Sequence, residues 1–262
     1  MLRSIWNSRS GMAAEMDKLD AISNNMANST TVGYKRVDVK FNDLMQENLD
    51  RLGYPVSKGQ GKLQVTGGGV KSTEIERDNA QGNLLQTNNN TDLAIDGKGY
   101  FKVVDGEGRT LYTRGGSFNI DPSGTVVDKN GNRLVILNEN GIDVNTGRAG
   151  FTKDSFNVSE DGYMRSDKHR GLRIPIYDTI GDNSMKSIGE NLYTPLIQGN
   201  GKNDVIESKD FSLLQGFTEQ SNVDLGKEMT DLIVTQRAFQ LNSSALKTAD
   251  EMWGMANNLR GR

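Results

Sequence analysis

The last forty residues of the chain, 223–262, constrain the fold more than any other stretch. They contain no proline, and large apolar residues recur in them at intervals of seven. The main series is Leu225, Leu232, Phe239, Leu246 and Trp253, and a neighbouring series is Ala238, Ala245, Met252 and Leu259. This spacing predicts a long amphipathic helix with a wide apolar stripe. A helix of about 35 residues spans about 50 Å, so we expect it to project from its own domain and to need partners elsewhere.

Residues 4–27 predict a second amphipathic helix. Its apolar positions are Ile5, Met12, Leu19 and Met26 at intervals of seven, with Met16 and Ile22 on flanking positions. This stripe is narrow, and a helix of this kind is marginal in water on its own because helix nucleation is costly. A run of Ser, Asn and Thr over residues 23–31 and the following Gly33 predict where the helix ends. We therefore expect the two terminal helices to pair with one another or with other copies.

The middle of the chain, residues 93–218, predicts β-structure. Apolar runs of three to six residues alternate there with turn dipeptides, which are the strongest hairpin signal in a single sequence. These dipeptides are Asp96-Gly97, Asp105-Gly106, Asn130-Gly131, Asn140-Gly141, Asp161-Gly162 and Asn200-Gly201. The sequence Asp121-Pro122-Ser123-Gly124 adds a tight turn with proline at its first corner. Few of the 30 glycines fall in the two terminal segments, which supports a helix–β–helix order.

The fold class that follows is α+β, with discontinuous terminal helices that pair as a coiled coil and a central hairpin-rich region. We expect three parts: a helical assembly domain from residues 1–32 and 223–262, a linking region over 33–92, and a β-rich outer domain over 93–222. The stretch Val37–Leu49 is compatible with a short strand or a helical turn. Glycine and polar turn residues make residues 50–92 resemble loops with a few isolated strands.

Composition excludes several classes of function. The net charge is −3 with mixed signs, and no basic tract resembles a nucleic-acid patch. No apolar run approaches the length of about 18 residues that a membrane-spanning helix needs. The chain has no cysteine, which excludes disulfides and thiolate metal sites. The first twenty residues lack the apolar core and cleavage site of a secretory signal peptide, so we expect no cleaved signal.

Motifs for catalysis are also missing from the sequence. The one histidine, His169, lies in a polar stretch and is interpreted as a surface residue. There is no zinc-protease motif, no phosphate-binding GxxxxGK[ST] loop and no GxSxG nucleophile motif. The glycines of 96–99 are interpreted as a hairpin turn, and residues 121–129 lack the ligand pattern of a calcium loop. We therefore expect a protein that is not an enzyme and that binds no metal or cofactor.

Three stretches resemble the axial proteins of the bacterial flagellum, the family of rod, hook and hook-associated proteins. The first runs from Ile22 to Lys35 and carries the signature residues Asn24, Asn25, Ala27, Asn28, Gly33, Tyr34 and Lys35. Met26 stands where leucine is commoner in the family, and Val32 where threonine is. The second runs over 93–118 and includes Asp96, Gly97 and Gly99. The third follows Ser221-Asn222-Val223-Asp224 and includes Gln236 and Arg237.

The resemblance implies a structural subunit that polymerises into a hollow helical filament. Its terminal helices would line the inner tube, with the β-region outside, and the chain length resembles a distal rod subunit more than a proximal rod or hook subunit. The implied partners are other copies, other rod and hook proteins, the flagellar type III export apparatus, and possible ring-protein and peptidoglycan contacts in the cell envelope. On this view the assembly interface contains Ile5, Met12, Leu19, Ile22, Met26, Leu225, Met229, Leu232, Phe239, Leu246 and Trp253.

Two functions of other classes stay open at this point. An envelope enzyme that cuts peptidoglycan would need a paired acid and carboxylate in a cleft, and the acidic residues here are scattered through turns. A secreted carbohydrate-binding β-module would keep its function after both terminal helices were removed. Neither class accounts for the long apolar stripe at the end of the chain.

Overall fold

The computed structural model describes residues 2–44, 47–48, 65–146, 150–153, 156–165, 171–179, 185–195, 205–208 and 210–260. Two compact units divide the chain. The helical unit contains Met1–Ala27, Val37–Glu76 and Asp224–Arg262. The β unit contains Asn28–Arg36 and Arg77–Val223. The predicted α+β class with terminal helices around a β-rich middle is confirmed. His169 and the dipeptide Asn200-Gly201 lie outside the described residues.

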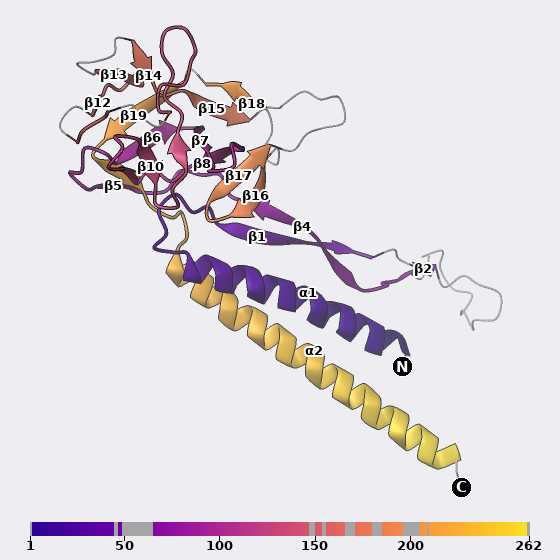
Figure 1. Cartoon of the computed structure of the whole chain (residues 1–262). Coiled ribbons are helices and arrows are strands. Elements are labelled where there is room, and N and C mark those ends of the chain that lie inside the picture. Colours follow the sequence, from indigo (N-terminus) through magenta and orange to yellow (C-terminus); the bar gives the residue numbers. More distant parts are fainter. Residues whose placement is uncertain are drawn as a thin grey trace. The chain divides into compact units, whose positions relative to one another are not determined.

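Two helices dominate the helical unit. Helix α1 spans Leu2–Ala27, and helix α2 spans Leu225–Arg260, a length of 36 residues or about 54 Å. They run side by side in Figure 1, in agreement with their many mutual contacts. Asp224 caps α2, because its carboxylate accepts hydrogen bonds from the backbone N–H groups of Gly226 (2.9 Å) and Lys227 (3.3 Å). In the described part of the chain, neither helix is long and apolar enough to cross a membrane.

A narrow β-ribbon completes the helical unit. Strand β1 (Val37–Asp43) pairs with β4 (Val70–Arg77), and the short strand β2 (Glu47–Asn48) pairs antiparallel with β3 (Val65–Thr66). Within the stretch 37–49, which the sequence left open between strand and helical turn, residues 37–43 and 47–48 are strands. Residues 50–92 were expected to be loops with a few isolated strands, and the strands described there include β4, which is eight residues long, and β5 (Leu84–Gln86). The residues of β4 are mostly polar, so the strand lacks the alternation of apolar and polar residues that identifies a half-buried strand.

The β unit is built around a nine-stranded sheet. Its main path runs in the order β16, β17, β8, β7, β11, β10, β9, and β15 joins it by pairing with β7 and with β18. The bounds are β7 Tyr100–Val104, β8 Thr110–Thr113, β9 Phe118–Ile120, β10 Val126–Asp128, β11 Arg133–Leu134, β15 Ile176–Thr179, β16 Met185–Gly189, β17 Leu192–Pro195 and β18 Val205–Glu207.

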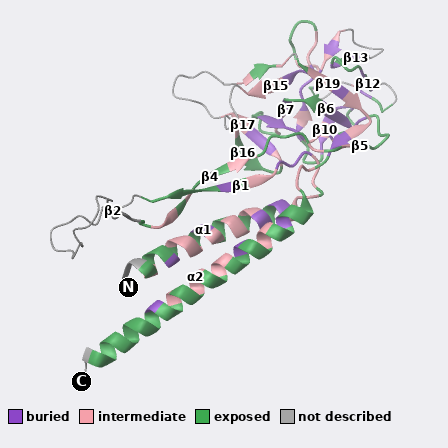
Figure 2. Ribbon diagram, turned by 180° about the vertical axis from the view of Figure 1, so that it is seen from behind, coloured by how far each residue is buried: buried purple, intermediate pink, exposed green. Residues whose placement is uncertain are grey.

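Three smaller sheets surround it. One contains β12 (Asn157–Val158), β13 (Tyr163–Arg165) and β14 (Leu172–Arg173) in that order. The second pairs β6 (Leu93–Gly97) with β19 (Phe211–Gln215), and the third pairs β5 with β20 (Phe217–Glu219). Most of the hydrophobic core lies in the β unit, and Figure 2 shows buried residues gathered among its strands. Phe101 and Phe118 meet edge to face at its centre, with ring centroids 5.3 Å apart.

Most of the predicted turns are confirmed. Asp105-Gly106 joins β7 to β8, Asn130-Gly131 joins β10 to β11, and Asp161-Gly162 joins β12 to β13. The proline turn closes with a 2.7 Å hydrogen bond from the N–H of Gly124 to the carbonyl of Asp121. The loop at 140–141 closes with a hydrogen bond between the backbones of Asn138 and Ile142.

One predicted hairpin is wrong. The dipeptide Asp96-Gly97 does not fold β6 back onto β7, because β6 pairs with β19 and β7 pairs with β8. Gly97 and Gly99 both have positive φ angles, of 109° and 133°, and let the chain leave one sheet for the other. The partner strand of β6 lies more than one hundred residues later in the chain, and local turn chemistry carries no information about such a pairing.

Candidate assembly surface of the terminal helices

The contact line between α1 and α2, called here the seam, centres on small and polar residues. On α2 the buried positions Glu228, Thr235 and Ala249 lie at multiples of seven, with Asn242 at the intervening position. On α1 the buried positions are Ser8, Ala14, Ile22 and Asn25. The seven-residue spacing of the α2 series is present in the sequence, but a pattern of apolar heptads does not include its polar members.

The predicted apolar stripe flanks this seam, and its members differ in exposure. Ile22 is buried, and Leu225, Met229 and Trp253 are exposed. The remaining members are half-buried: Ile5, Met12, Leu19, Met26, Leu232, Phe239 and Leu246. The structure therefore brings the middle of both stripes toward the seam and leaves the two ends of the α2 stripe in solvent.

A second apolar surface, called here the outer face, lies on α2 away from the seam. Its members are exposed large side chains: Met229, Ile233, Val234, Leu241, Met252, Met255 and Leu259. Leu241 is 72% exposed and Leu259 is 80% exposed. From 250 to 259 every residue of α2 is exposed, as the continuous green end of that helix in Figure 2 shows. Large apolar side chains exposed in this number on one helix indicate a site of association.

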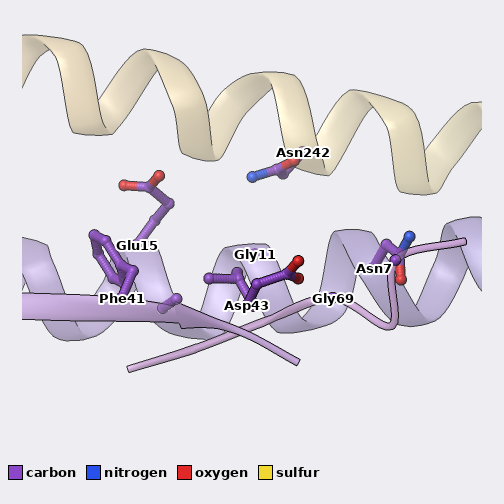
Figure 3. A pocket seen from close by; sticks show the side chains of 10 residues that line it. Asn7, Gly11, Glu15, Phe41, Asp43, Gly69 and Asn242 are labelled. Atoms are coloured by element: carbon purple, nitrogen blue, oxygen red, sulfur yellow. The ribbon is translucent and has the colours of Figure 1, made fainter. Parts of the chain in front are cut away.

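A cleft of about 450 Å³ opens in the helical unit between both helices and the β-ribbon. Figure 3 shows Asn242 of α2 directed toward Gly11 of α1, with Gly69 on the opposite wall. The approach is close, because a Cβ atom on Gly11 would lie 3.0 Å from Nδ2 of Asn242. Glu15 and Asp43 give the cleft an acidic character. Among the described residues, no group of three His, Cys, Asp or Glu side chains could hold a metal ion.

Asn25, from the first signature stretch, organises the end of the seam near the β-ribbon. Its side-chain amide donates to the carbonyl of Val37 (2.8 Å) and to Oε2 of Glu228 (3.2 Å), and its Oδ1 accepts from the N–H of Val37 (2.9 Å). Asn25 and Glu228 are both 0% exposed. Asn25 thus connects the end of α1, the start of β1 and the first turn of α2. The neighbouring Asn24 and Ala27 are exposed.

The other signature residues near the N-terminus belong to the β unit. The hydroxyl of Thr31 donates to Oδ1 of Asn28 (3.3 Å) in the turn after α1, and Tyr34 is buried. Lys35 is 3% exposed and donates from Nζ to Oε1 of Glu219 (2.6 Å) and to the carbonyl of Ala80 (2.7 Å). The signature lysine is therefore a buried structural residue.

Lys35, Glu219 and Arg114 form a buried ion cluster, and Arg114 connects it to two further signature residues. Its Nε donates to Oε2 of Glu219 at 2.5 Å, and its remaining guanidinium nitrogens donate to the carbonyls of Ile95, Gly97 and Gly99. Glu219 could not be predicted from the sequence, because nothing local distinguishes this acid from the other acidic residues. Lys35 lies far from Gly97 and Gly99 in the chain, and the three come together only around Arg114 and Glu219.

Charge explains how a glutamate can be buried here. Burial alone would raise the pKa of Glu219, but the charges of Arg114 and Lys35, with hydrogen bonds from Lys35 and from the N–H of Gly82, outweigh it and lower that pKa below its ordinary value. Burial also lowers the pKa of Lys35, against the opposing charge of Glu219. The carboxylate is therefore ionised and compensated at neutral pH.

The remaining signature residues are exposed. Asp96 accepts a hydrogen bond from the amide of Gln81 (3.2 Å) beside the ion cluster. On α2, Gln236 and Arg237 face solvent, and the guanidinium of Arg237 donates to Gln240 one turn later (3.0 Å). These three residues take no part in the seam.

Replacing Gly33 with alanine is expected to lower the free energy of unfolding of the β unit by about 1–3 kcal/mol. The φ angle of Gly33 is +70°, and an added Cβ atom would lie 2.6 Å from the backbone nitrogen of Gly115. Chemical denaturation followed by far-ultraviolet circular dichroism measures the change in unfolding free energy. Gly106→Ala is the matched control, because a Cβ atom there meets nothing within 4 Å. Equal unfolding free energies of the two variants would show that the φ angle and the close contact of Gly33 do not require glycine.

Comparisons with known proteins agree with this arrangement. Three family models match the chain: the flagella basal body rod protein model over residues 5–35, the flagellar hook protein FlgE/F/G D1 domain over 94–166, and the flagellar basal body rod FlgEFG protein C-terminal model over 214–259. The first and third cover most of α1 and α2.

Whole-length relatives agree with the family models. The chain is 32% identical to the flagellar basal-body rod protein FlgG of Borreliella burgdorferi, with 99% of both chains covered. It is 33% identical to FlgG of Bacillus subtilis, over 99% of this chain and all of that protein, and 34% identical to FlgG of Agrobacterium fabrum, over 96% and 97%. FlhP of Bacillus subtilis, a flagellar hook-basal body complex protein, is 28% identical. The chain therefore belongs to the FlgE/F/G family of flagellar rod and hook proteins, as a homologue of the distal rod protein FlgG.

Proposed function

We propose that the chain polymerises helically into the hollow shaft of the flagellar rod through surfaces of α1 and α2 that a single copy leaves uncovered. Its family membership makes it a structural subunit of the rod. The observation that supports polymerisation through the helices is the outer face of α2, where large apolar side chains stand in solvent. Repeated contacts between two different surfaces that do not close on themselves produce open helical filaments.

The predicted interface residues have separate places in this proposal. Leu232, Phe239 and Leu246, with Met12 and Leu19 of α1, stabilise the pair of helices within one copy. Leu225, Met229 and Trp253 are exposed together with the outer face and would be covered by neighbouring copies. Each large apolar side chain that becomes buried contributes about 1.5–3 kcal/mol, so a few of them per neighbour are enough to support a filament.

The family also supports a set of partners and a place in the cell. The FlgG relatives are rod proteins of the flagellar basal body, which supports a structural, non-enzymatic role at that site. We propose that other rod and hook proteins continue the filament at both of its ends. We further propose export through the flagellar type III apparatus without a cleaved signal, passage through the cell envelope, and contacts with ring proteins and peptidoglycan there.

Deletion of residues 250–262 tests the polymerisation proposal. This segment contains the exposed end of α2 but leaves the seam intact as far as Ala249. The shortened chain is expected to stay a folded monomer, with unchanged melting of the β unit, and to form no rods in light scattering or electron microscopy. Bacteria that carry the deletion are expected to lose motility.

Removal of 261–262 alone is the matched control, because it shortens the chain without taking away any apolar member of the outer face. Rods are expected from this control at the same protein concentration as from the full chain. If the longer deletion polymerises equally well, the end of α2 is not part of the assembly surface.

A further inference from the structure

The apolar stripes of α1 and α2 do not by themselves define which residues lie opposite one another. Met12 and Leu19 on α1 lie seven residues apart, as do Leu232, Phe239 and Leu246 on α2. Sliding one helix by seven residues would again place apolar side chains against apolar side chains. Hydrophobic burial therefore distinguishes poorly between registers that differ by one such repeat.

Two contacts in the seam do distinguish these registers. Asn25 donates to the carboxylate of Glu228, and Gly11 lies against the amide of Asn242. From the first contact to the second, α1 runs back by fourteen residues while α2 runs forward by fourteen, so both belong to one antiparallel register. A slip of seven residues would place Thr235 opposite Asn25 and Ala249 opposite Gly11.

The contact between Asn25 and Glu228 carries the larger penalty on slipping. Both side chains are fully buried, and the Asn25 amide is at the same time bound to both backbone groups of Val37. A slip would separate the carboxylate of Glu228 from this amide and replace it with the hydroxyl of Thr235. Losing a hydrogen bond to a buried charged group costs more than exchanging one apolar contact for another.

We propose that Asn25 and Glu228 are positioning residues that select the antiparallel register of α1 and α2. A single buried polar contact in a heptad seam is a known physical means of choosing register at some cost in stability. The consequence for assembly rests on the proposed function: a slip of one repeat would move the exposed end of α2 by about 10 Å along α1. The outer face would then be displaced from the surface of the neighbouring copy that it contacts.

Cysteine cross-linking of the full chain tests the register directly, because the natural sequence has no cysteine. The pair Gly11→Cys with Asn242→Cys reports the native register, and Gly11→Cys with Ala249→Cys reports the slipped one. Both are oxidised in dilute solution, and the intramolecular product is measured by gel mobility. With Asn25 and Glu228 in place, only the 11–242 pair is expected to close.

Asn25→Ala is expected to raise the ratio of slipped to native cross-link by at least about tenfold, the effect of one lost hydrogen bond to a charged group. Asn24→Ala is the matched control, since Asn24 is the adjacent signature asparagine and is exposed. It is expected to leave the ratio unchanged.

Two substitutions of Glu228 keep the test decisive if Asn25→Ala fails to fold. Glu228→Leu adds an apolar side chain to the seam, so it is expected to preserve or raise helix melting and yet to increase the slipped product. Glu228→Gln retains an oxygen that accepts from Asn25 and is expected to preserve the native register. A change in stability alone would not increase the slipped product in Glu228→Leu while Glu228→Gln keeps the native register.

Exclusive 11–242 closure in both Asn25→Ala and Glu228→Leu would overturn the proposal. It would mean that the chain connections after Ala27 and before Leu225 hold the register without these side chains. If the register slips as expected and rods still form at an unchanged protein concentration, the register assignment stands and the proposed assembly surface is wrong.

Discussion

Replacing Leu241 with aspartate is expected to raise the protein concentration needed for polymerisation by more than about tenfold while the isolated chain stays folded. Leu241 is 72% exposed on the outer face of α2, so one copy loses almost no packing when it is changed. Between copies, the substitution removes apolar burial and places a charge in the contact, which carries a further desolvation cost. Sedimentation and electron microscopy across a concentration series measure the effect.

Gln240→Asp is the matched control for this prediction. Gln240 is the preceding residue on the same helix and is exposed, and because it is already polar its substitution removes no apolar side chain. The control introduces the same charge and is expected to polymerise at nearly the concentration of the natural chain. If both variants polymerise alike, or if Leu241→Asp melts at a lower temperature than its control, the outer face is not the contact between copies.

Replacing Glu219 with glutamine is expected to lower the free energy of unfolding of the β unit by about 3–5 kcal/mol. The substitution leaves two buried cations, Lys35 and Arg114, at 3% and 5% exposure without their shared carboxylate. Chemical denaturation at neutral pH measures the loss. Glu207→Gln is the control, because Glu207 pairs with Arg173 at the surface, where both side chains are about two-fifths exposed. A surface pair of this kind contributes about 1 kcal/mol or less.

The same variant has a defined pH dependence. The pKa of Glu219 in the folded protein lies below its ordinary value of 4.5, so the unfolded chain takes up a proton first as the pH falls. The stabilisation from the ionised carboxylate is therefore complete above that ordinary value and is lost as the pH falls through the lower folded-state pKa. We expect the difference in unfolding free energy between natural chain and Glu219→Gln to shrink below pH 4.5. A difference independent of pH would contradict the role of this charge.

Local patterns predicted the parts of the fold that depend on neighbours in sequence. The proline-free heptads gave the two long helices, and dipeptides such as Asp105-Gly106 and Asn130-Gly131 gave the hairpins that they join. These signals work because a turn or a helical face is defined within a few residues. The signature stretches gave the family by the same local means.

Pairings between distant segments could not be predicted in this way. Strand β6 pairs with β19, and Glu219 contacts Lys35 and Arg114. No local sequence pattern predicts these contacts. The seam has polar residues at its centre, Glu228, Thr235 and Asn242, and a count of apolar heptads does not find them. A search for heptads of small or polar residues, opposite an apolar stripe, would have found them.

The helical unit is assembled from three separate pieces of the chain, and this has a consequence for timing. Helix α1 comes first along the chain and α2 comes last, so α1 has no partner helix until the whole β unit has been synthesised or, under the proposed export route, threaded out. A chain delivered N-terminus first can complete its β unit before the seam exists. If copies assemble through α2 as proposed, newly arriving subunits cannot adhere to one another until that helix emerges, and polymerisation would begin only when the chain is complete.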